Sequence, residues 1–405
     1  MADDILLAKL HGVSDLELAT LLSLICRQHC IVSTEPDDVD RLAQELQLIT
    51  AHTFALKPIV LDCHHSTSLE DFAAGIQLPP SLTSPTPRPA SPYHRQSHLH
   101  AHNPQASFGH ASYHSGRLAP RTSTATGDSR WPASPVAAAG EVANVVLAKN
   151  LDLAPKAVQI QALELLRTRR LFTRSNVLVA PRSFLLIAVL SAPFGGEARL
   201  TPHLNDFFYL AHWHDSDDGF MNLEAEWDSK GKGKDAVPSS SSSDDDTASF
   251  ESVVRTKRGS YSDAGGGRDG GHDGEPLFTE HDISTLANLS QDVSVDVDVI
   301  RYQMNLVSFL RLHRAVAGGI SPTATKHFGQ LMRCLAPLHG LDFVTPSLVA
   351  LAAKKVYLHR IRVVTPEKER SMQWGSDVRA IKEILQDVGP EDIIDDVLHM
   401  VATPL

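Results

Sequence analysis

The centre of the chain reads NVVLAKNLDLAPKAVQIQALELLRTRRLFTRSNVLVAPRSFLLIAVLSAP, residues 144–193. Its apolar run Val145–Ala148 is typical of a buried strand. Pro155 then opens an amphipathic helix, because apolar side chains recur on one face, at Val158, Ala162, Leu165 and Leu166. A small hairpin (Leu171–Thr173 and Asn176–Val179) and a second buried strand (Phe184–Leu190) follow. This order of strand, helix, hairpin and strand predicts an α/β unit with a parallel sheet.

The residues before this centre predict further strands and helices of the same kind. Ser14 and Glu17 have the spacing of a helix capping box, and the apolar helix LATLLSLICRQ follows them. We expect strands at His29–Ser33 and Ile59–Cys63, a helix at Pro36–Phe54 and a helical turn at Leu69–Ala74.

Two segments differ sharply in composition from the rest of the chain. The first runs from Pro79 to about Gly140 and is rich in Pro, Ser, Thr and His. The second runs from about Asp228 to Glu275 and contains SSSSSDDD and GGGRDGGHDG. Both have few large apolar side chains whose burial could offset the entropy of ordering the backbone. We therefore predict that both are disordered.

From Phe278 onward the apolar pattern is helical again. It predicts three helices, with Gly340 as a helix stop and Thr345-Pro346 as the next helix start: Val299–Val316, Pro322–His339 and Pro346–Arg362. The tail Gly375–Leu405 reads as an additional helical segment.

Composition limits the class of protein. The chain has 405 residues, and 37 Lys and Arg against 48 Asp and Glu give a net charge of −11, which argues against a general nucleic-acid binder. No window holds the ~18 consecutive apolar residues that a membrane span requires. The first residues, MADDILLAKL, lack the apolar stretch of a secretory leader, so we expect a cytoplasmic protein.

Two groups of residues have side chains that commonly bind metals. Cys26 and Cys30 lie one helical turn apart, and His98, His100 and His102 alternate within the first low-complexity segment. No second Cys or His pair has a spacing that would complete the first group. Polar low complexity accounts for the second group. We therefore predict no metal site.

Several pieces of the chain resemble MoxR and magnesium-chelatase-type AAA+ ATPases. LAKNLDLAP, VQIQALELLRTRRLF and PRSFLLIAVLSAP are similar to the centre of that family, and RLTPHLNDFFYLAHW to the segment that ends its ATPase core. YQMNLVSFLRLHRAVAGGISP, APLHGLDFVTP and AAKKVYLHRI are similar to its lid. The resemblance implies a P-loop-type parallel sheet core with helices on both faces and a C-terminal all-α lid. The expected boundaries are a core at 1–225 with a disordered insert at about 80–140, a disordered linker at 226–277, a lid at 278–365 and a helical extension at 366–405.

ATP hydrolysis in that family needs a Gly-rich loop with a Lys, an Asp on Mg²⁺, a Glu that orients water, and arginines. The resemblance places the loop at Thr34–Arg41, which has no glycine and no lysine. Asp38 lies within it, and either Val39 or Asp40 stands at the position of the Lys. The metal Asp and the catalytic Glu correspond to Lys149 and Asn150.

The remaining family positions lie further along the chain. A polar sensor corresponds to Ser191, an Asp-Arg-Phe to Asn205-Asp206-Phe207, and a Ser-Pro-Arg to Ser321-Pro322-Thr323. The last two changes each remove an arginine. The resemblance thus implies a degenerate nucleotide site without catalytic residues, at Thr34, Asp38, Asp40, Arg41, Lys149, Asn150, Ser191, Asp206 and Thr323.

Electrostatics weighs against nucleotide binding at these positions. A carboxylate about 5 Å from a phosphate charge is repelled by about 3 kcal/mol at an effective dielectric of ~20. Loss of a comparable Lys attraction roughly doubles this, and about 6 kcal/mol is on the order of 10⁴ in affinity. We expect an acid of the first loop to pair with Lys149 in the space that nucleotide and Mg²⁺ would fill. An ordinary solvated surface is the alternative.

The sequence leaves two candidate functions. The first is a non-catalytic interaction or chaperone-like subunit that binds protein partners without a cofactor, including an inactive member within a ring of AAA+ homologues. The second is the ATPase subunit of magnesium chelatase, which inserts Mg²⁺ into protoporphyrin IX at the expense of ATP. The second function would require ATP, Mg²⁺ and partner subunits that this chain does not contain.

Overall fold

The structure is a computed structural model that describes residues 4–79, 141–174, 176–192, 200–231 and 276–404. Its centre is a five-stranded parallel sheet in the order β2-β3-β6-β1-β7. The strands are β1 (Cys30–Thr34), β2 (Pro58–Asp62), β3 (Val145–Lys149), β6 (Leu185–Ser191) and β7 (Leu210–Trp213). The predicted α/β fold with a parallel sheet is confirmed.

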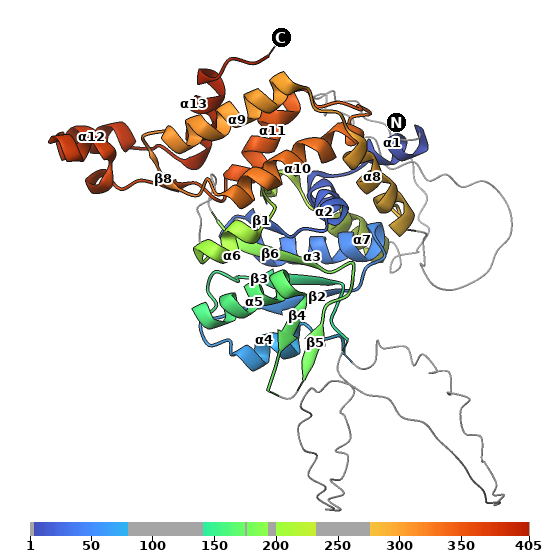
Figure 1. Cartoon of the computed structure of the whole chain (residues 1–405). Helices are drawn as coiled ribbons and strands as arrows, with labels where there is room; N and C mark the ends of the chain where they lie inside the picture. The colour runs from blue at the N-terminus through green and yellow to red at the C-terminus, as the bar shows by residue number, and fades with distance from the viewer. Residues whose placement is uncertain (1–3, 80–140, 175, 193–199, 232–275, 405) are drawn as a thin grey trace, which may run out of the picture. The chain divides into compact units, whose positions relative to one another are not determined.

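Alternation along the strands gives the sheet two apolar faces, because successive side chains point to opposite sides. On β1, Cys30 and Val32 join one hydrophobic cluster, and Ile31 joins the other. Helix α3 (Val39–Leu48) covers the first face, and α4 (Leu69–Gly75), α5 (Lys156–Thr168) and α6 (Pro202–Phe207) cover the second (Figure 1). The predicted hairpin is present as β4 (Arg170–Phe172) and β5 (Val177–Val179).

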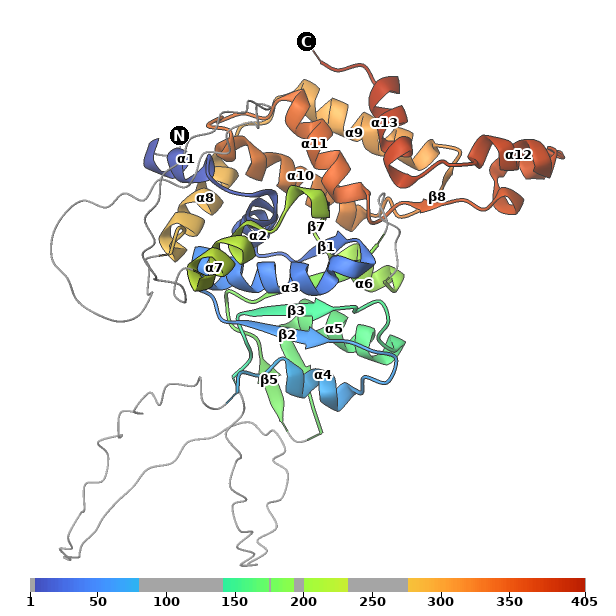
Figure 2. The same cartoon turned by 180° about the vertical axis from the view of Figure 1, so that it is seen from behind.

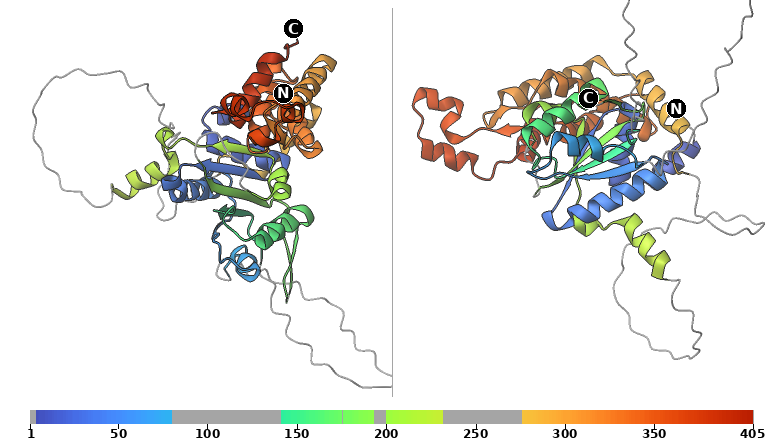
Figure 3. Two further views of the ribbon diagram at one scale, coloured as in Figure 1. Left: turned by 90° about the vertical axis from the view of Figure 1, so that its left-hand side faces the viewer. Right: turned by 90° about the horizontal axis from the view of Figure 1, so that it is seen from below.

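Most of the C-terminal helices join the hydrophobic cluster of the first face, whereas α12 (Val378–Leu385) extends away from the sheet (Figure 2). The C-terminal helices are α8 (Glu280–Asp292), α9 (Val297–Leu312), α10 (Pro322–Leu338), α11 (Pro346–Tyr357), α12 and α13 (Pro390–Met400). One continuous hydrophobic cluster joins most of these helices to the sheet and to α2 (Asp15–Cys26). The lid is therefore held to the core by a shared apolar interior. Figure 3 shows the C-terminal helices, in orange and red, gathered on one side of the sheet.

Local sequence signals explain where the helices begin and end. The predicted capping box at the start of α2 is present, because the Ser14 hydroxyl accepts from the Glu17 N–H and the Glu17 carboxylate accepts from the Ser14 N–H. The Ser321 and Thr345 hydroxyls cap α10 and α11 by accepting from the Ala324 and Leu348 N–H groups. Gly340, with φ of +70°, ends α10 as predicted.

Four predicted boundaries differ from the structure. The helix expected at 36–54 is a 3₁₀ turn (Pro36–Asp38), α3, and a π turn (Ile49–Thr53). The lid helices end early, at Leu312 and Tyr357, because the residues after them form a hairpin of β8 (Val316–Gly318) and β9 (Arg362–Val363). The apolar residues of this hairpin extend the helical pattern, which made the predicted helices too long.

The other two differences concern the ends of the domains. Helix α7 (Met221–Gly231) occupies the first residues of the predicted linker 226–277. In the predicted extension 366–405, α13 buries Ile393, Ile394 and Val397 in the main hydrophobic cluster, so it packs as part of the helical layer. Helix α1 (Asp4–Leu10) precedes α2. The predicted disordered segments, apart from their ends, and His98, His100 and His102 lie outside the described residues.

Candidate functional site

The carboxyl edge of the sheet gathers most of the predicted site positions. Thr34 and Ser191 are register partners at the ends of β1 and β6. Lys149 ends β3 and is the register partner of Asp62 on β2. Ligands of open parallel sheets bind at this edge, so its side chains define the first candidate site.

Lys149 holds this edge together through two carboxylates. Its Nζ lies 2.6 Å from Asp40 Oδ1 and 2.7 Å from Asp62 Oδ2. Burial by itself lowers the pKa of Lys149, but the hydrogen bonds with Asp40 and Asp62 outweigh it and leave the pKa raised. The Lys149 ammonium is therefore a fixed charge shared by two acids. We name Asp40, Asp62 and Lys149 the edge cluster.

The connection from β1 to α3 contains acids where a phosphate-binding loop would carry glycines. Thr34 is followed by Glu35 and by the 3₁₀ turn Pro36–Asp38, and Pro36 has no N–H to offer a phosphate. Arg41 donates to Asp38 Oδ1 (3.0 Å), and its guanidinium lies 4.6 Å from the centre of the Phe220 ring. The pKa of Asp38 is lowered by the Ser216 hydroxyl and by Arg41.

Asn150 and Thr34 have backbone or buried roles at the same edge. Asn150 adopts a left-handed conformation (φ 54°), donates its N–H to the Val189 carbonyl (2.9 Å) and begins the turn after β3. The Thr34 hydroxyl is fully buried, and no described residue forms a hydrogen bond with it. Neither residue carries a carboxylate that could bind a metal or orient water.

Asp206 and Thr323 take part in a second set of contacts, between core and lid. Asp206 Oδ1 accepts from the Ser321 hydroxyl (2.5 Å) and lies 3.5 Å from Arg360 Nε, while Thr323 follows Ser321 in the first turn of α10. Neither Asp206 nor Ser321 has a hydrogen bond or ion pair with the edge cluster in the described part of the chain. The sequence thus predicted one site where the structure has two sets of contacts.

Arg360 is the centre of the second set. It is 2% exposed and donates to the Val356 carbonyl (2.5 Å), to the Phe208 carbonyl and to His327 Nδ1 (2.7 Å). Burial lowers its pKa to about 10. Asn205 adds a hydrogen bond to the His359 carbonyl (2.6 Å). These polar contacts fix the α6–β7 connection of the core against the lid helices.

Sequence reasoning missed Asp62 and Arg360 as members of these contacts. Asp62 could have been found, since it is the penultimate residue of the predicted strand Ile59–Cys63 and the ends of parallel strands meet at one edge. Arg360 gave no such signal, because the Asp206 and Phe208 carbonyls that it binds belong to residues far away in the chain.

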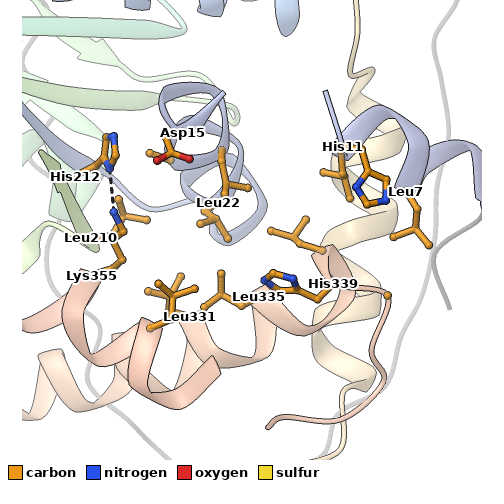
Figure 4. Close-up of a pocket in the computed structure, with 16 residues that line it drawn as sticks. Leu7, His11, Asp15, Leu22, Leu210, His212, Leu331, Leu335, His339 and Lys355 are labelled. Atoms are coloured by element: carbon orange, nitrogen blue, oxygen red, sulfur yellow. Dashed lines mark hydrogen bonds between the residues drawn. The ribbon is translucent and has the colours of Figure 1, made fainter. Parts of the chain in front are cut away.

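A second candidate site is an apolar pocket of about 650 Å³ between α2, β7, α10 and α11 (Figure 4). Its walls are mainly leucines, including Leu22, Leu331 and Leu335. At one end Lys355 Nζ donates to His212 Nδ1 (2.9 Å), near Asp15 (Figure 4). Burial lowers the pKa of Lys355. Chemically, the pocket suits an apolar group, and its polar end offers one desolvated ammonium.

Two absences apply to the part of the chain that is described. No three His, Cys, Asp or Glu side chains gather in an arrangement that could hold a metal ion. Cys26 and Cys30 do not form the metal pair considered from the sequence, because Cys26 instead faces Cys334. Among the described helices, none combines the length and apolarity needed to cross a membrane.

Comparison with known proteins supports the architecture. Residues 308–384 match the family described as the AAA lid domain. A protein from Cytophaga hutchinsonii, provisionally called an ATPase, superimposes with a TM-score of 0.57 at 11% identity over 99% of this chain and 94% of its own. A full-length MCM homologue from Methanopyrus kandleri gives a TM-score of 0.39 at 10% identity, covering 87% of this chain and 57% of its own. The chain thus has an α/β AAA+ fold with a C-terminal helical lid.

One curated relative matches in sequence. Maintenance of telomere capping protein 2 from Lachancea thermotolerans is 27% identical over 113 residues, which is 27% of this chain. The match spans 40% of the length of that relative.

Proposed function

We propose that this chain is a non-catalytic AAA+ protein that acts by binding other proteins, as an interaction or chaperone-like subunit. The observation that carries the proposal is the edge cluster: Lys149 binds Asp40 and Asp62 where a nucleotide-hydrolysing chain needs a metal-binding acid. A lysine repels Mg²⁺, and its ammonium is already shared by two carboxylates.

The local charge supports the proposal. Lys149 and Arg41 contribute +2 at this edge, whereas Glu35, Asp37, Asp38, Asp40 and Asp62 contribute −5, so the net charge is −3. ATP is itself an anion, and like charges about 5 Å apart repel by about 3 kcal/mol at an effective dielectric of ~20. The residues present therefore do not fit ATP and Mg²⁺.

The proposed protein-binding role has a surface to match. The hairpin β4–β5 exposes Phe172 (55%), Val177 (45%) and Val179 (61%), and Phe172 and Val177 are register partners. Large apolar side chains gathered on a solvent-facing hairpin are typical of protein interaction sites. We propose that this hairpin contacts a protein partner. A homologous AAA+ subunit in the same ring would be one such partner.

The sequence relative agrees with a role in an assembly. Its name assigns it to the maintenance of telomere capping, and we propose for this chain a similar supporting role within a protein complex. The magnesium-chelatase alternative would need ATP binding at the edge cluster, so one measurement separates the two functions.

The test is a calorimetric titration of the purified full chain with Mg-ATP up to millimolar concentration. We expect no saturable heat and no ATP hydrolysis above background. Saturable binding that depends on Mg²⁺ would overturn the proposal and favour the ATPase alternative, and a change of that binding in Lys149→Met would place it at the edge cluster. Arg301→Met, which removes an exposed surface charge paired with Asp298, is the matched control.

A further inference from the structure

Cys26 and Cys334 bring two thiols together from distant parts of the chain. Cys26 is the last residue of α2, and Cys334 lies on α10 of the lid, 308 positions away. Their sulfur atoms are 2.9 Å apart, and the Cys26 sulfur also lies 3.0 Å from the Tyr209 hydroxyl oxygen. Both cysteines are free thiols in the structure. A disulfide requires about 2.05 Å between sulfurs, so the pair needs a movement of about 0.9 Å.

The thiol pair is reachable although both residues are buried. Cys26 is 8% exposed and Cys334 is 3% exposed, and both line a cavity of about 740 Å³. Arg27 and Arg333 line the same cavity. Their positive charges favour the approach of an anionic reagent and stabilise a thiolate.

The two thiols differ in acidity, so that one of them is the more readily ionised nucleophile. The hydrogen bond from Cys26 lowers the pKa of Cys334, although burial opposes this. Burial, together with Cys334, raises the pKa of Cys26. Cys334 is thus the sulfur that more readily becomes the thiolate nucleophile.

We propose that Cys26 and Cys334 are a redox-active dithiol that a small anionic disulfide, such as oxidised glutathione, converts into a disulfide joining α2 to α10. The Cys334 thiolate attacks one sulfur of the reagent, which forms a mixed disulfide and releases one glutathione thiolate. Cys26 then loses its proton to solvent and attacks the Cys334 sulfur, which releases the second glutathione. In total, two protein thiols and one glutathione disulfide become one protein disulfide and two glutathione thiols.

This bond would fasten the lid to the core covalently. Helices α2 and α10 already pack against each other, so the two sulfurs that must close this gap lie on neighbouring helices. Because it closes a loop of about three hundred residues, it restricts the unfolded chain strongly. We expect the melting temperature to rise by roughly 5–10 °C on oxidation.

The other two cysteines provide an internal control. Cys30 and Cys63 are also buried, but burial raises the pKa of each to about 12, and no described thiol lies in contact with either. An oxidant that acts through the cavity should leave both unmodified.

The experiment exposes the folded, reduced full chain to increasing ratios of oxidised to reduced glutathione. Alkylation and peptide mass spectrometry then identify the modified cysteines. We expect loss of two thiols and a crosslinked peptide pair containing Cys26 and Cys334. The Cys26→Ser variant should stop at one glutathione on Cys334, and Cys334→Ser should show no crosslink, while Cys63→Ala should behave as the parent.

The folding of each variant is checked by its melting temperature under reducing conditions. Crosslinking that appears only in urea, or that joins Cys30 or Cys63, would overturn the proposal. An unchanged set of four alkylated thiols at high glutathione disulfide, with the parent protein folded, would also overturn it.

Discussion

Lys149 and Asp62 lie opposite each other on neighbouring parallel strands, with 2.7 Å between Nζ and Oδ2. The side chain of Lys149 is 15% exposed, whereas those of Asp62 and Asp40 are 40% and 75% exposed. The lysine is thus largely enclosed while its partners are partly solvated. Solvent screening at the carboxylates limits the free energy of each ion pair.

Removal of the Lys149 charge should destabilise the fold moderately. An ion pair with solvated partners contributes up to about 1 kcal/mol, so Lys149→Met, which keeps the apolar stem, should lower the free energy of unfolding by about 1–2 kcal/mol. Urea unfolding measures the change. Arg301→Met breaks the exposed pair with Asp298 and should cost under about 0.5 kcal/mol. Equal losses of unfolding free energy in the two variants would show that the edge cluster stabilises the fold no more than an ordinary surface ion pair does.

Charge inversion tests whether the edge cluster acts as a unit. If Asp40 were the only partner of Lys149, Asp40→Lys with Lys149→Asp would restore the pair. The structure predicts that this double variant stays less stable than the parent, because the new aspartate would face Asp62 at the distance of an ion pair. Adding Asp62→Lys should recover most of the loss. A double variant as stable as the triple would mean that Asp62 does not contribute.

Much of the fold could be predicted from the sequence, because strand and helix patterns are local. The apolar run at Val145–Ala148 and the cap at Ser14 are examples that the structure confirms. The pairing of an acid of the first loop with Lys149 was one of the two expectations, and in the structure that acid is Asp40. Whether this edge was once a nucleotide site stays a prediction.

The contacts that could not be predicted join residues distant in sequence. The Cys26–Cys334 and Arg360–Phe208 contacts depend on how the lid packs on the core, which no local pattern encodes. The hairpin β8–β9 was missed for a related reason. Its strands are short and flank helices whose apolar periodicity runs into them.

Buried histidines should make the protein sensitive to acid. His29, His212 and His327 each accept a hydrogen bond at Nδ1, from the Leu186 N–H, Lys355 and Arg360. Burial is the main cause that lowers the pKa of each to about 3. The folded state therefore binds fewer protons than the unfolded state between pH 6.5 and about 3. Stability is complete above pH 6.5 and is lost as the pH falls below it.

The size of this effect sets the expected acid transition. Below pH 6.5 each histidine lowers the free energy of unfolding by about 1.4 kcal/mol per pH unit, so the three together lower it by roughly 4 kcal/mol per unit. Against a typical stability of 5–15 kcal/mol, unfolding is expected a few pH units below 6.5. Circular dichroism against pH measures it. His327→Gln, whose amide can still accept from Arg360, should reduce the slope, whereas the exposed His281→Gln should not. An equal slope in all three proteins would contradict the assignment.

The last prediction concerns Gly319, which follows β8 beside Arg360. Its φ is +111°, and a Cβ there would lie 1.9 Å from the Arg360 carbonyl oxygen, which is far inside contact distance. Gly319→Ala must therefore displace the backbone of the residue that holds the α6–β7 connection to the lid. We expect a loss of more than about 3 kcal/mol in the free energy of unfolding, since steric overlap adds to backbone strain.

Gly375 provides the matched control for strain alone. Its φ is +81°, but a Cβ there would meet no atom within 4 Å. Gly375→Ala should cost only about 1 kcal/mol, which is the ordinary penalty of a left-handed alanine. Urea unfolding of both variants measures the difference. If Gly319→Ala were no less stable than Gly375→Ala, the close approach of Gly319 to the Arg360 carbonyl would not exist in solution. The contact of Arg360 with the α6–β7 connection would then be looser than its hydrogen bonds indicate.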